Sequence, residues 1–167
     1  ASLTGHLVFA TLHTNSAAGA MPRLIDMKTE PFLISSTLRV VAAQRLVPLL
    51  CDNCKKTLEA PAPIGKTIQK ALENLPPSVG GSFKEPYSIY RAAGCDKCRG
   101  KGFIGRIAIF EVFEMSPTIE AIIMGGPTTE KLLAETKRQG MVSLRQDGVL
   151  KALAGLVSIE EIIRETE

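Results

Sequence analysis

The feature that most constrains the fold of this chain is its four cysteines, which form two Cys-x-x-Cys pairs. The first pair is Cys51 and Cys54, and the second is Cys95 and Cys98. Two residues between the thiols let a tight turn direct both sulfurs at one point, so two such turns supply the thiolates of a tetrahedral zinc site. Because four protein ligands leave no open position for water, we expect such a site to be structural.

Other uses of the cysteine pairs stay open at this point. Two disulfides would require an oxidising compartment, and no signal peptide opens the chain. An iron–sulfur cluster also takes four thiolates, although its usual spacings place three cysteines close together. A redox Cys-x-x-Cys would leave the second pair unexplained. The spacing favours zinc over these alternatives.

The composition is that of a globular protein. With 167 residues, 45% of them hydrophobic and 22% charged, the chain can form one ordinary domain or two small ones. No apolar run approaches the length of a membrane-spanning helix, so the sequence predicts no transmembrane segment. Residues 1–6 contain neither an initiator Met nor a cationic targeting region, which indicates a cut inside a larger protein.

Charge is spread unevenly along the chain, although the formal net charge is only +3. Residues 51–106 carry ten Lys and Arg against five Asp and Glu, whereas residues 107–167 carry six against ten. Zinc bound by four thiolates contributes about −2, which lowers the middle segment to roughly +3. This is well short of a nucleic-acid-binding surface, and stacking residues are few, so we expect no nucleic-acid partner.

A short, nearly continuous apolar run of strand-forming residues occupies positions 7–12. Such a run predicts a strand that is buried on both faces, as in a parallel sheet. A polar turn at 13–16 and a helix over about 17–27 follow, with Asn15 or Ser16 able to cap the helix. Folds of the α/β class place ligand-binding groups where a strand passes into a helix.

The remaining hydrophobic pattern predicts an alternation of strands and helices, and hence an α/β fold class. Gly140 is expected to end a helix, and Ser158 with Glu161 matches a capping box. The expected elements are strands near 43–47 and 104–112, a helix with Pro31 in its first turn, and helices near 64–75, 118–124, 128–139, 144–153 and 158–164.

The chain has only two histidines, His6 and His13, at opposite ends of the run 7–12. Their spacing of seven would turn them to opposite faces of an ideal strand. A histidine at a strand terminus is a satisfied polar residue more often than a catalytic one. The residues alone leave both interpretations open.

A resemblance to a known family adds to this reading. Residues 4–17 read Thr-Gly-His-Leu-Val-Phe-Ala-Thr-Leu-His-Thr-Asn-Ser-Ala, and this segment resembles the histidine box of the type II secretion and type IV pilus assembly ATPases. Further motifs match in order at 23–27, 30–33, 43–47, the two cysteine pairs, 105–111, 140–148 and 158–161. The cysteine pairs are typical of the assembly and export branch. Two departures are Lys28, where a glycine is common, and Pro48, where a basic residue is common.

The resemblance implies a hexameric motor with a RecA-like core that hydrolyses ATP with Mg²⁺. The chain would then be the C-terminal part of an α/β, RecA-like P-loop NTPase core with a four-cysteine zinc arm and a C-terminal helical subdomain. The implied division is 1–50 for the core part with the histidine box, 51–104 for the zinc-binding arm, and 105–167 for a strand and the helical subdomain. Implied partners are other copies of the chain, an inner-membrane platform protein and the secretion or pilus machinery, with a cytoplasmic location at the inner membrane.

The same resemblance assigns roles to individual residues. His13 matches the box histidine nearest the γ-phosphate, and His6 matches its companion. A histidine there can orient the attacking water or report loss of the phosphate. Arg45 matches the arginine of a Gln-Arg-Leu motif near the nucleotide and is a plausible charge partner for phosphate. The cysteine pairs match the family's zinc ligands.

Two motifs that ATP hydrolysis requires are absent from the sequence. No Gly-x-x-x-x-Gly-Lys-Ser/Thr occurs, so the phosphate-binding loop is missing. No apolar strand ends in the acidic pair that would hold Mg²⁺. We therefore expect the C-terminal piece of an ATPase that is inactive alone. The alternative is a zinc-stabilised protein-docking module with no nucleotide role.

Overall fold

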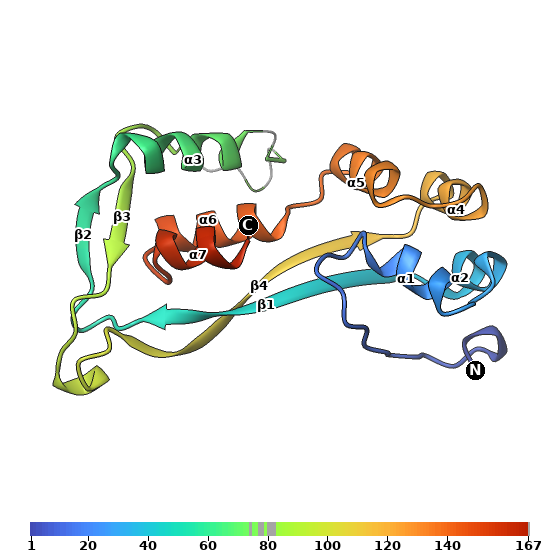
Figure 1. The fold of residues 1–167 in the computed structure, drawn as a ribbon, viewed down its shortest axis with the longest axis horizontal. Coiled ribbons are helices and arrows are strands. Elements are labelled where there is room, and N and C mark those ends of the chain that lie inside the picture. The colour runs from blue at the N-terminus through green and yellow to red at the C-terminus, as the bar shows by residue number, and fades with distance from the viewer. Residues whose placement is uncertain (74, 77–78, 80–82, 167) are drawn as a thin grey trace. The chain divides into compact units, whose positions relative to one another are not determined.

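The computed structural model describes residues 1–73, 75–76, 79 and 83–166 (Figure 1). These residues form a mixed α/β structure of two compact units. Unit 1 comprises Ala1–Ala43 and Glu111–Met141, and unit 2 comprises Gln44–Phe110 and Val142–Glu167. Strands β1 (Val40–Leu50) and β4 (Phe103–Glu114) pair with each other, and each continues from one unit into the other.

Unit 1 is built around short helices that bury apolar side chains. Its elements are the 3-10 turn η1 (Ser2–Thr4) and the helices α1 (Ala20–Asp26), α2 (Pro31–Thr37), α4 (Pro117–Met124) and α5 (Thr129–Arg138). Its core includes Met21, Ile34, Phe113, Ile119 and Leu132. The predicted placement of Pro31 is confirmed, because it occupies the first helical position, where its missing N–H costs no hydrogen bond.

Residues 7–12 depart most from the sequence-based prediction. They form no strand, and Leu7 and Phe9 are 83% and 88% exposed. A buried strand needs a neighbouring strand for its backbone N–H and C=O groups and other elements to cover both faces. Among the described residues only β1 with β4 and β2 with β3 form sheets, and neither sheet includes this run. The predicted buried strand is therefore wrong for this structure.

The helix predicted from residue 17 begins three residues later, at Ala20. The intervening residues form a turn in which the Gly19 N–H donates to the Ser16 hydroxyl at 3.2 Å. Ser16 therefore acts locally as the capping residue that the sequence suggested, but it caps the turn that leads into the helix. Pro22 falls in the first turn of α1, where proline is tolerated, so it delays the helix without breaking it.

The described residues of unit 2 combine a short antiparallel pair of strands with three α-helices (Figure 1). Strands β2 (Lys56–Glu59) and β3 (Ser88–Arg91) pair in the register Lys56 with Arg91. The helices are α3 (Ala62–Leu72), α6 (Leu144–Leu153) and α7 (Ile159–Glu165), and the 3-10 turn η2 spans Asp96–Cys98. The core that they share includes Val47, Ile68, Ile89, Ile109 and Ile162.

Serine hydroxyls cap the N-termini of the two C-terminal helices, α6 and α7. Ser143 and Gln146 form a reciprocal capping box at the start of α6, with the Ser143 N–H donating to Gln146 Oε1 at 2.9 Å. The box predicted at Ser158 is only half formed, since the Ser158 hydroxyl accepts the Glu161 N–H at 3.4 Å. Each cap satisfies an amide that has no partner within its own helix, which fixes where the chain turns into α6 and α7.

Candidate metal centre and nucleotide-site residues

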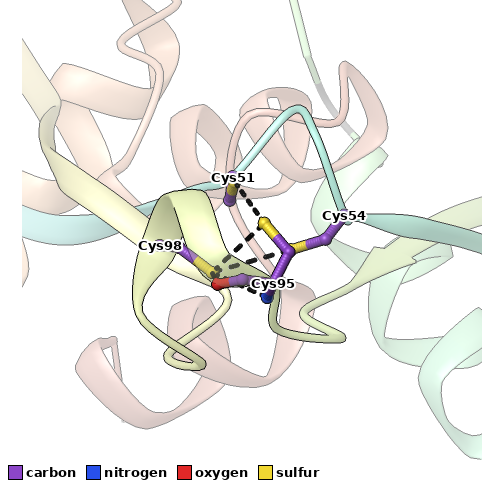
Figure 2. Close-up of side chains that lie close together, drawn as sticks. All are labelled: Cys51, Cys54, Cys95 and Cys98. Atoms are coloured by element: carbon purple, nitrogen blue, oxygen red, sulfur yellow. Dashed lines mark hydrogen bonds between the residues drawn. The ribbon is translucent and has the colours of Figure 1, made fainter.

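The two cysteine pairs converge on one point within unit 2 (Figure 2). The Sγ–Sγ distances are 3.9 Å for Cys51 and Cys95, 3.8 Å for Cys54 and Cys98, and 3.7 Å for Cys95 and Cys98. A tetrahedron with metal–sulfur bonds of about 2.3 Å has edges of about 3.8 Å. All four sulfurs lie within 4.8 Å of one another and thus fit the ligand set of a single metal ion.

The same distances argue against the disulfide alternative. The sulfur atoms of a disulfide are about 2.0 Å apart, whereas the cysteines here are free thiols separated by nearly twice that distance. The sulfurs also surround a common centre, which a pair of disulfides does not require. The geometry therefore supports a metal site, as the spacing of the pairs predicted.

Backbone geometry holds the second cysteine turn in place. Cys98 Sγ accepts the N–H groups of Cys95 and Gly102, both at 3.1 Å. Gly94 has a φ of +91°, and a Cβ added to it would lie 2.6 Å from the carbonyl oxygen of Gly100. A side chain at this position would therefore push the two ends of the turn apart. The sulfur positions follow from the backbone that the turn imposes.

The thiols of the cluster differ in pKa. The Asn53 side-chain amide, which donates to Cys95 Sγ at 3.5 Å, and the backbone amide of Cys98 lower the pKa of Cys95 to about 6. Burial raises the pKa of Cys54 to about 11. Burial also pushes the pKa of Cys98 upward, but the two amides that donate to its sulfur lower it overall. A cation at the centre would stabilise the thiolates that bind it, so metal binding releases protons.

The two predicted catalytic histidines are both exposed in unit 1. His6 Nδ1 lies 3.0 Å from Thr4 Oγ1 and 3.3 Å from the carbonyl oxygen of Ala1. These contacts belong to the turn that precedes the run 7–12 and do not involve His13. Among the described residues, no hydrogen bond joins the two histidines, and their shared role stays a prediction.

Glu111 anchors the chain just after residues 6–13, which we call the histidine-bearing segment. Its role was not predicted from the sequence. The residue is only 6% exposed, and its Oε1 accepts the N–H of Ala17 at 2.6 Å. The sequence did contain a signal for this role. Ile109, Glu111 and Phe113 occupy alternate positions on the buried face of β4, and Glu111 is the charged residue among them. A carboxylate on the buried side of a strand needs donors, and the Ala17 amide is one of them.

Arg45, the predicted phosphate ligand, lies half-buried on β1 in unit 2. Its Nη1 donates to the backbone carbonyl of Glu165 at 2.5 Å. This carbonyl is in the last turn of α7, where the helix dipole favours a cation. Arg45 is thus bound to α7 in this structure, a contact that the sequence did not suggest.

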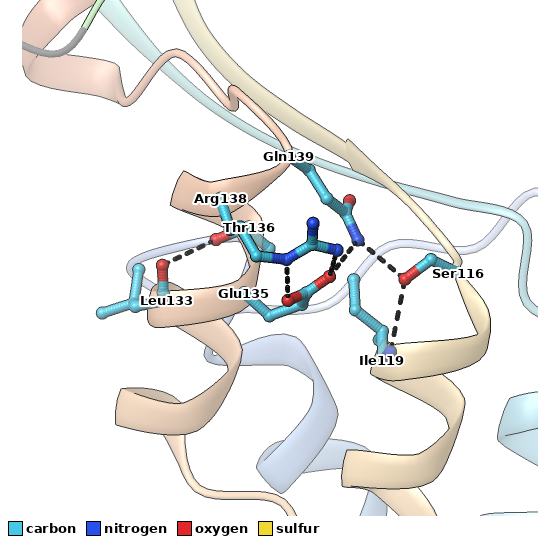
Figure 3. Close-up of polar contacts among 7 residues, drawn as sticks. All are labelled: Ser116, Ile119, Leu133, Glu135, Thr136, Arg138 and Gln139. Atoms are coloured by element: carbon cyan, nitrogen blue, oxygen red, sulfur yellow. Dashed lines mark hydrogen bonds and ion pairs between the residues drawn. The ribbon is translucent and has the colours of Figure 1, made fainter.

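A further polar network joins two helices of unit 1 (Figure 3). Arg138 donates twice to the buried carboxylate of Glu135, at 2.7 Å each, which lowers the pKa of Glu135. Gln139 Nε2 reaches Ser116 Oγ at 2.7 Å, and Ser116 caps α4. Since Gln139 Nε2 also donates to Glu135 Oε1 at 3.0 Å, the network ties the end of α5 to the start of α4.

Comparison with known proteins identifies the class to which the chain belongs. The family described as type II/IV secretion system protein matches residues 1–164. The chain is a member of this family, as the resemblance of its motifs predicted. No helix in the described part of the chain has the length and apolar character needed to cross a membrane.

Among individual proteins, the chain is similar to ATPases of two kinds of machinery. Type II secretion system ATPase E of Vibrio cholerae is 43% identical over all of this chain and 31% of that protein. Type IV pilus assembly ATPase PilB of Myxococcus xanthus is 38% identical over 99% of this chain and 28% of that protein. Type II secretion system protein E of Pseudomonas aeruginosa is 39% identical over 99% of this chain and 31% of that protein. The chain therefore spans about a third of the length of these relatives.

Proposed function

We propose that this chain is the C-terminal part of a hexameric ATPase that couples ATP hydrolysis to type II protein secretion or type IV pilus assembly. The observation that carries the proposal is the family match over residues 1–164, together with 38–43% identity to named secretion and pilus assembly ATPases. The sequence contains no phosphate-binding loop, so the chain alone should not hydrolyse ATP.

Within this proposal the segments have separate tasks. Residues 1–50 belong to a RecA-like core, residues 51–104 form the metal-binding arm, and residues 105–167 supply a strand and the helical subdomain. Partners of the full-length protein are its other subunits, an inner-membrane platform protein and further components of the machinery. Its location is the cytoplasmic face of the inner membrane.

His13 is proposed to orient the attacking water or to sense loss of the γ-phosphate, with His6 as its companion. The exposure of both side chains supports roles that require access to a ligand. The exposed run 7–12 supports the further proposal that it gains a strand neighbour outside the described residues. Arg45 would pair with phosphate after giving up its hydrogen bond to Glu165.

Cys51, Cys54, Cys95 and Cys98 are proposed to hold one structural Zn²⁺. Four thiolates that lie within 4.8 Å of one another, three pairs of them 3.7–3.9 Å apart, suit a borderline-soft cation without a geometric preference of its own. When bound, zinc would supply a crosslink between two turns that are far apart in sequence. The Asn53 side chain and the backbone amides that donate to the sulfurs would then orient the ligands.

The proposal is tested by His13→Ala in the full-length protein that carries this chain. We expect turnover to fall by roughly 100-fold or more with little change in ATP affinity, because the residue acts on the γ-phosphate during hydrolysis. ATPase rates and nucleotide binding are measured together, with Ser36→Ala on α2 as an exposed control. Normal turnover with a large loss of affinity would contradict the role of His13.

A docking module without a nucleotide role is the second candidate, and the exposed cations of the second cysteine turn favour it. Lys97, Arg99 and Lys101 all lie exposed within this turn. Replacing the three cations by Gln in the full-length protein separates the candidates. Loss of partner capture with unchanged ATPase activity would support docking by the arm, whereas lost ATPase activity would support a direct contribution to the motor.

A further inference from the structure

Lys55 follows the first cysteine pair directly and makes an unusually complete set of contacts for a lysine. Its ammonium donates to Asp52 Oδ1 at 2.6 Å and to the carbonyl oxygen of Gly155 at 2.7 Å. It also lies 5.4 Å from the centroid of the Tyr90 ring. The side chain is only 23% exposed, so the two hydrogen bonds and the ring contact are partly shielded from water.

The carbonyl that receives Lys55 belongs to the short connection between α6 and α7. Gly155 has a φ of +73°, and a Cβ added to it would lie 3.0 Å from the ring atoms of Tyr90. The close approach of this ring therefore requires glycine. The next residue, Leu156, accepts the N–H of Leu50 at 2.8 Å. The connection is thus held from two sides, by the end of β1 and by Lys55.

The backbone of Lys55 is fixed by the cysteine turn itself. Its N–H donates to the Cys51 carbonyl at 2.9 Å, which is the hydrogen bond that closes the turn around Cys54. Any ligand that holds the sulfurs of Cys51 and Cys54 in place also fixes where the Lys55 side chain starts. The same side chain ends on the α6–α7 connection.

We infer that Lys55 couples metal binding at the four cysteines to the order of the α6–α7 connection, an inference that rests on the proposed metal site. The metal fixes the turn, the turn positions Lys55, and Lys55 holds the Gly155 carbonyl. Because such coupling is reciprocal, the contact with Gly155 strengthens metal binding by the same factor by which the metal orders the connection. Helix α7 carries the Glu165 carbonyl that binds Arg45, so the connection also determines how firmly Arg45 is held.

The experiment compares hydrogen exchange in the zinc-loaded and zinc-free chain for wild type, Lys55→Met and Lys56→Met. The amides of Ala154, Gly155 and Leu156 report on the connection, because they donate to carbonyls of α6. Lys56 is the matched control, since it is the exposed neighbour on β2. The Leu132 amide of unit 1 serves as internal reference. Zinc affinity is measured in parallel by competition with a chelator.

In wild type and Lys56→Met, we expect zinc to slow exchange at the connection by about tenfold, a typical size for coupling between sites. In Lys55→Met this protection should disappear, and zinc should bind more weakly by the same factor. Equal protection in wild type and Lys55→Met, or unchanged zinc affinity, would overturn the inference alone. Wild type that binds no zinc would overturn the metal site as well.

Two further variants keep the test decisive if Lys55→Met does not fold. Lys55→Arg retains a cation that reaches the Gly155 carbonyl and the Tyr90 ring, so it should preserve most of the metal-dependent protection. Tyr90→Leu keeps the ammonium but removes both its ring contact and the packing of the ring on Gly155, and it should lower the protection by about threefold. Full protection in Tyr90→Leu together with none in Lys55→Arg would contradict a role for the ammonium in these contacts.

Discussion

The four-cysteine cluster and the histidine-bearing segment differ in the origin of the contacts that shape them. The cluster is formed by two turns, and Cys98 Sγ accepts the amides of Cys95 and Gly102 from its own turn. The histidine-bearing segment contains an apolar run whose side chains are largely exposed and which pairs with no strand among the described residues. A turn carries its own geometry, whereas a strand takes its geometry from its neighbours.

The largest effect that this comparison predicts is the loss of the metal from Cys98→Ser. Cys98 is buried and accepts two backbone amides, so no exposed side chain can replace it as a ligand. Metal analysis of reduced protein should find one zinc per chain in wild type and almost none in the variant. Proteolysis should then cut within residues 51–104 and spare unit 1. Retention of one tightly held zinc by Cys98→Ser would refute the assignment.

The next effect concerns the acidity of Cys95 in metal-free protein. Because Asn53 lowers the pKa of Cys95 to about 6, its thiolate forms as the pH rises through 6 and is nearly complete at pH 7.5. Cys54, with a pKa of about 11, stays protonated there. Alkylation followed by mass spectrometry should modify Cys95 at least tenfold faster than Cys54 at pH 7.5. Asn53→Ala should narrow this difference, and equal rates in wild type would contradict the local control of acidity.

Glu111→Ala tests the anchor at Ala17, just after the histidine-bearing segment. The substitution leaves the N–H of Ala17 buried without its acceptor, since Ala17 is only 1% exposed. We expect a loss of roughly 2 kcal/mol in the free energy of unfolding, measured by denaturant titration. Glu114→Ala, an exposed carboxylate on the same strand, should change stability by less than about 0.5 kcal/mol. Similar losses in the two variants would show that burial of the anchor is unimportant.

The features that could be predicted from the sequence are those that depend on local contacts, as in the cysteine turns. The cysteine site, the position of Pro31 and the helices after residue 116 were predicted, because each depends on local spacing or capping. Lys28, where the resemblance led us to expect glycine, has a φ of +62°, a conformation that glycine adopts with least strain. Local chemistry is therefore sufficient for features of this kind.

Features that depend on distant contacts were missed or predicted wrongly. Strands β2 and β3 are four residues each and contribute mainly Leu58 and Ile89 to the core, so their alternation is too short to be distinctive. The apolar run 7–12 has the composition of a buried strand, but it pairs with no other strand in the described part of the chain. The contact between Arg45 and Glu165 joins residues 120 positions apart, and no pattern of spacing predicts it.

The smallest expected effect separates stability from function at the histidine-bearing segment. His13 is exposed, so His13→Ala should change the unfolding free energy of this chain by less than about 0.5 kcal/mol. The same substitution is expected to abolish most turnover in the full-length protein, because its proposed partner is the γ-phosphate. A stability loss as large as that of Glu111→Ala would mean that His13 packs within unit 1, and the difference between the two regions would then disappear. A silent His13→Ala in the chain with a large kinetic defect in the full-length protein would show that this segment gains its function from contacts beyond the described residues.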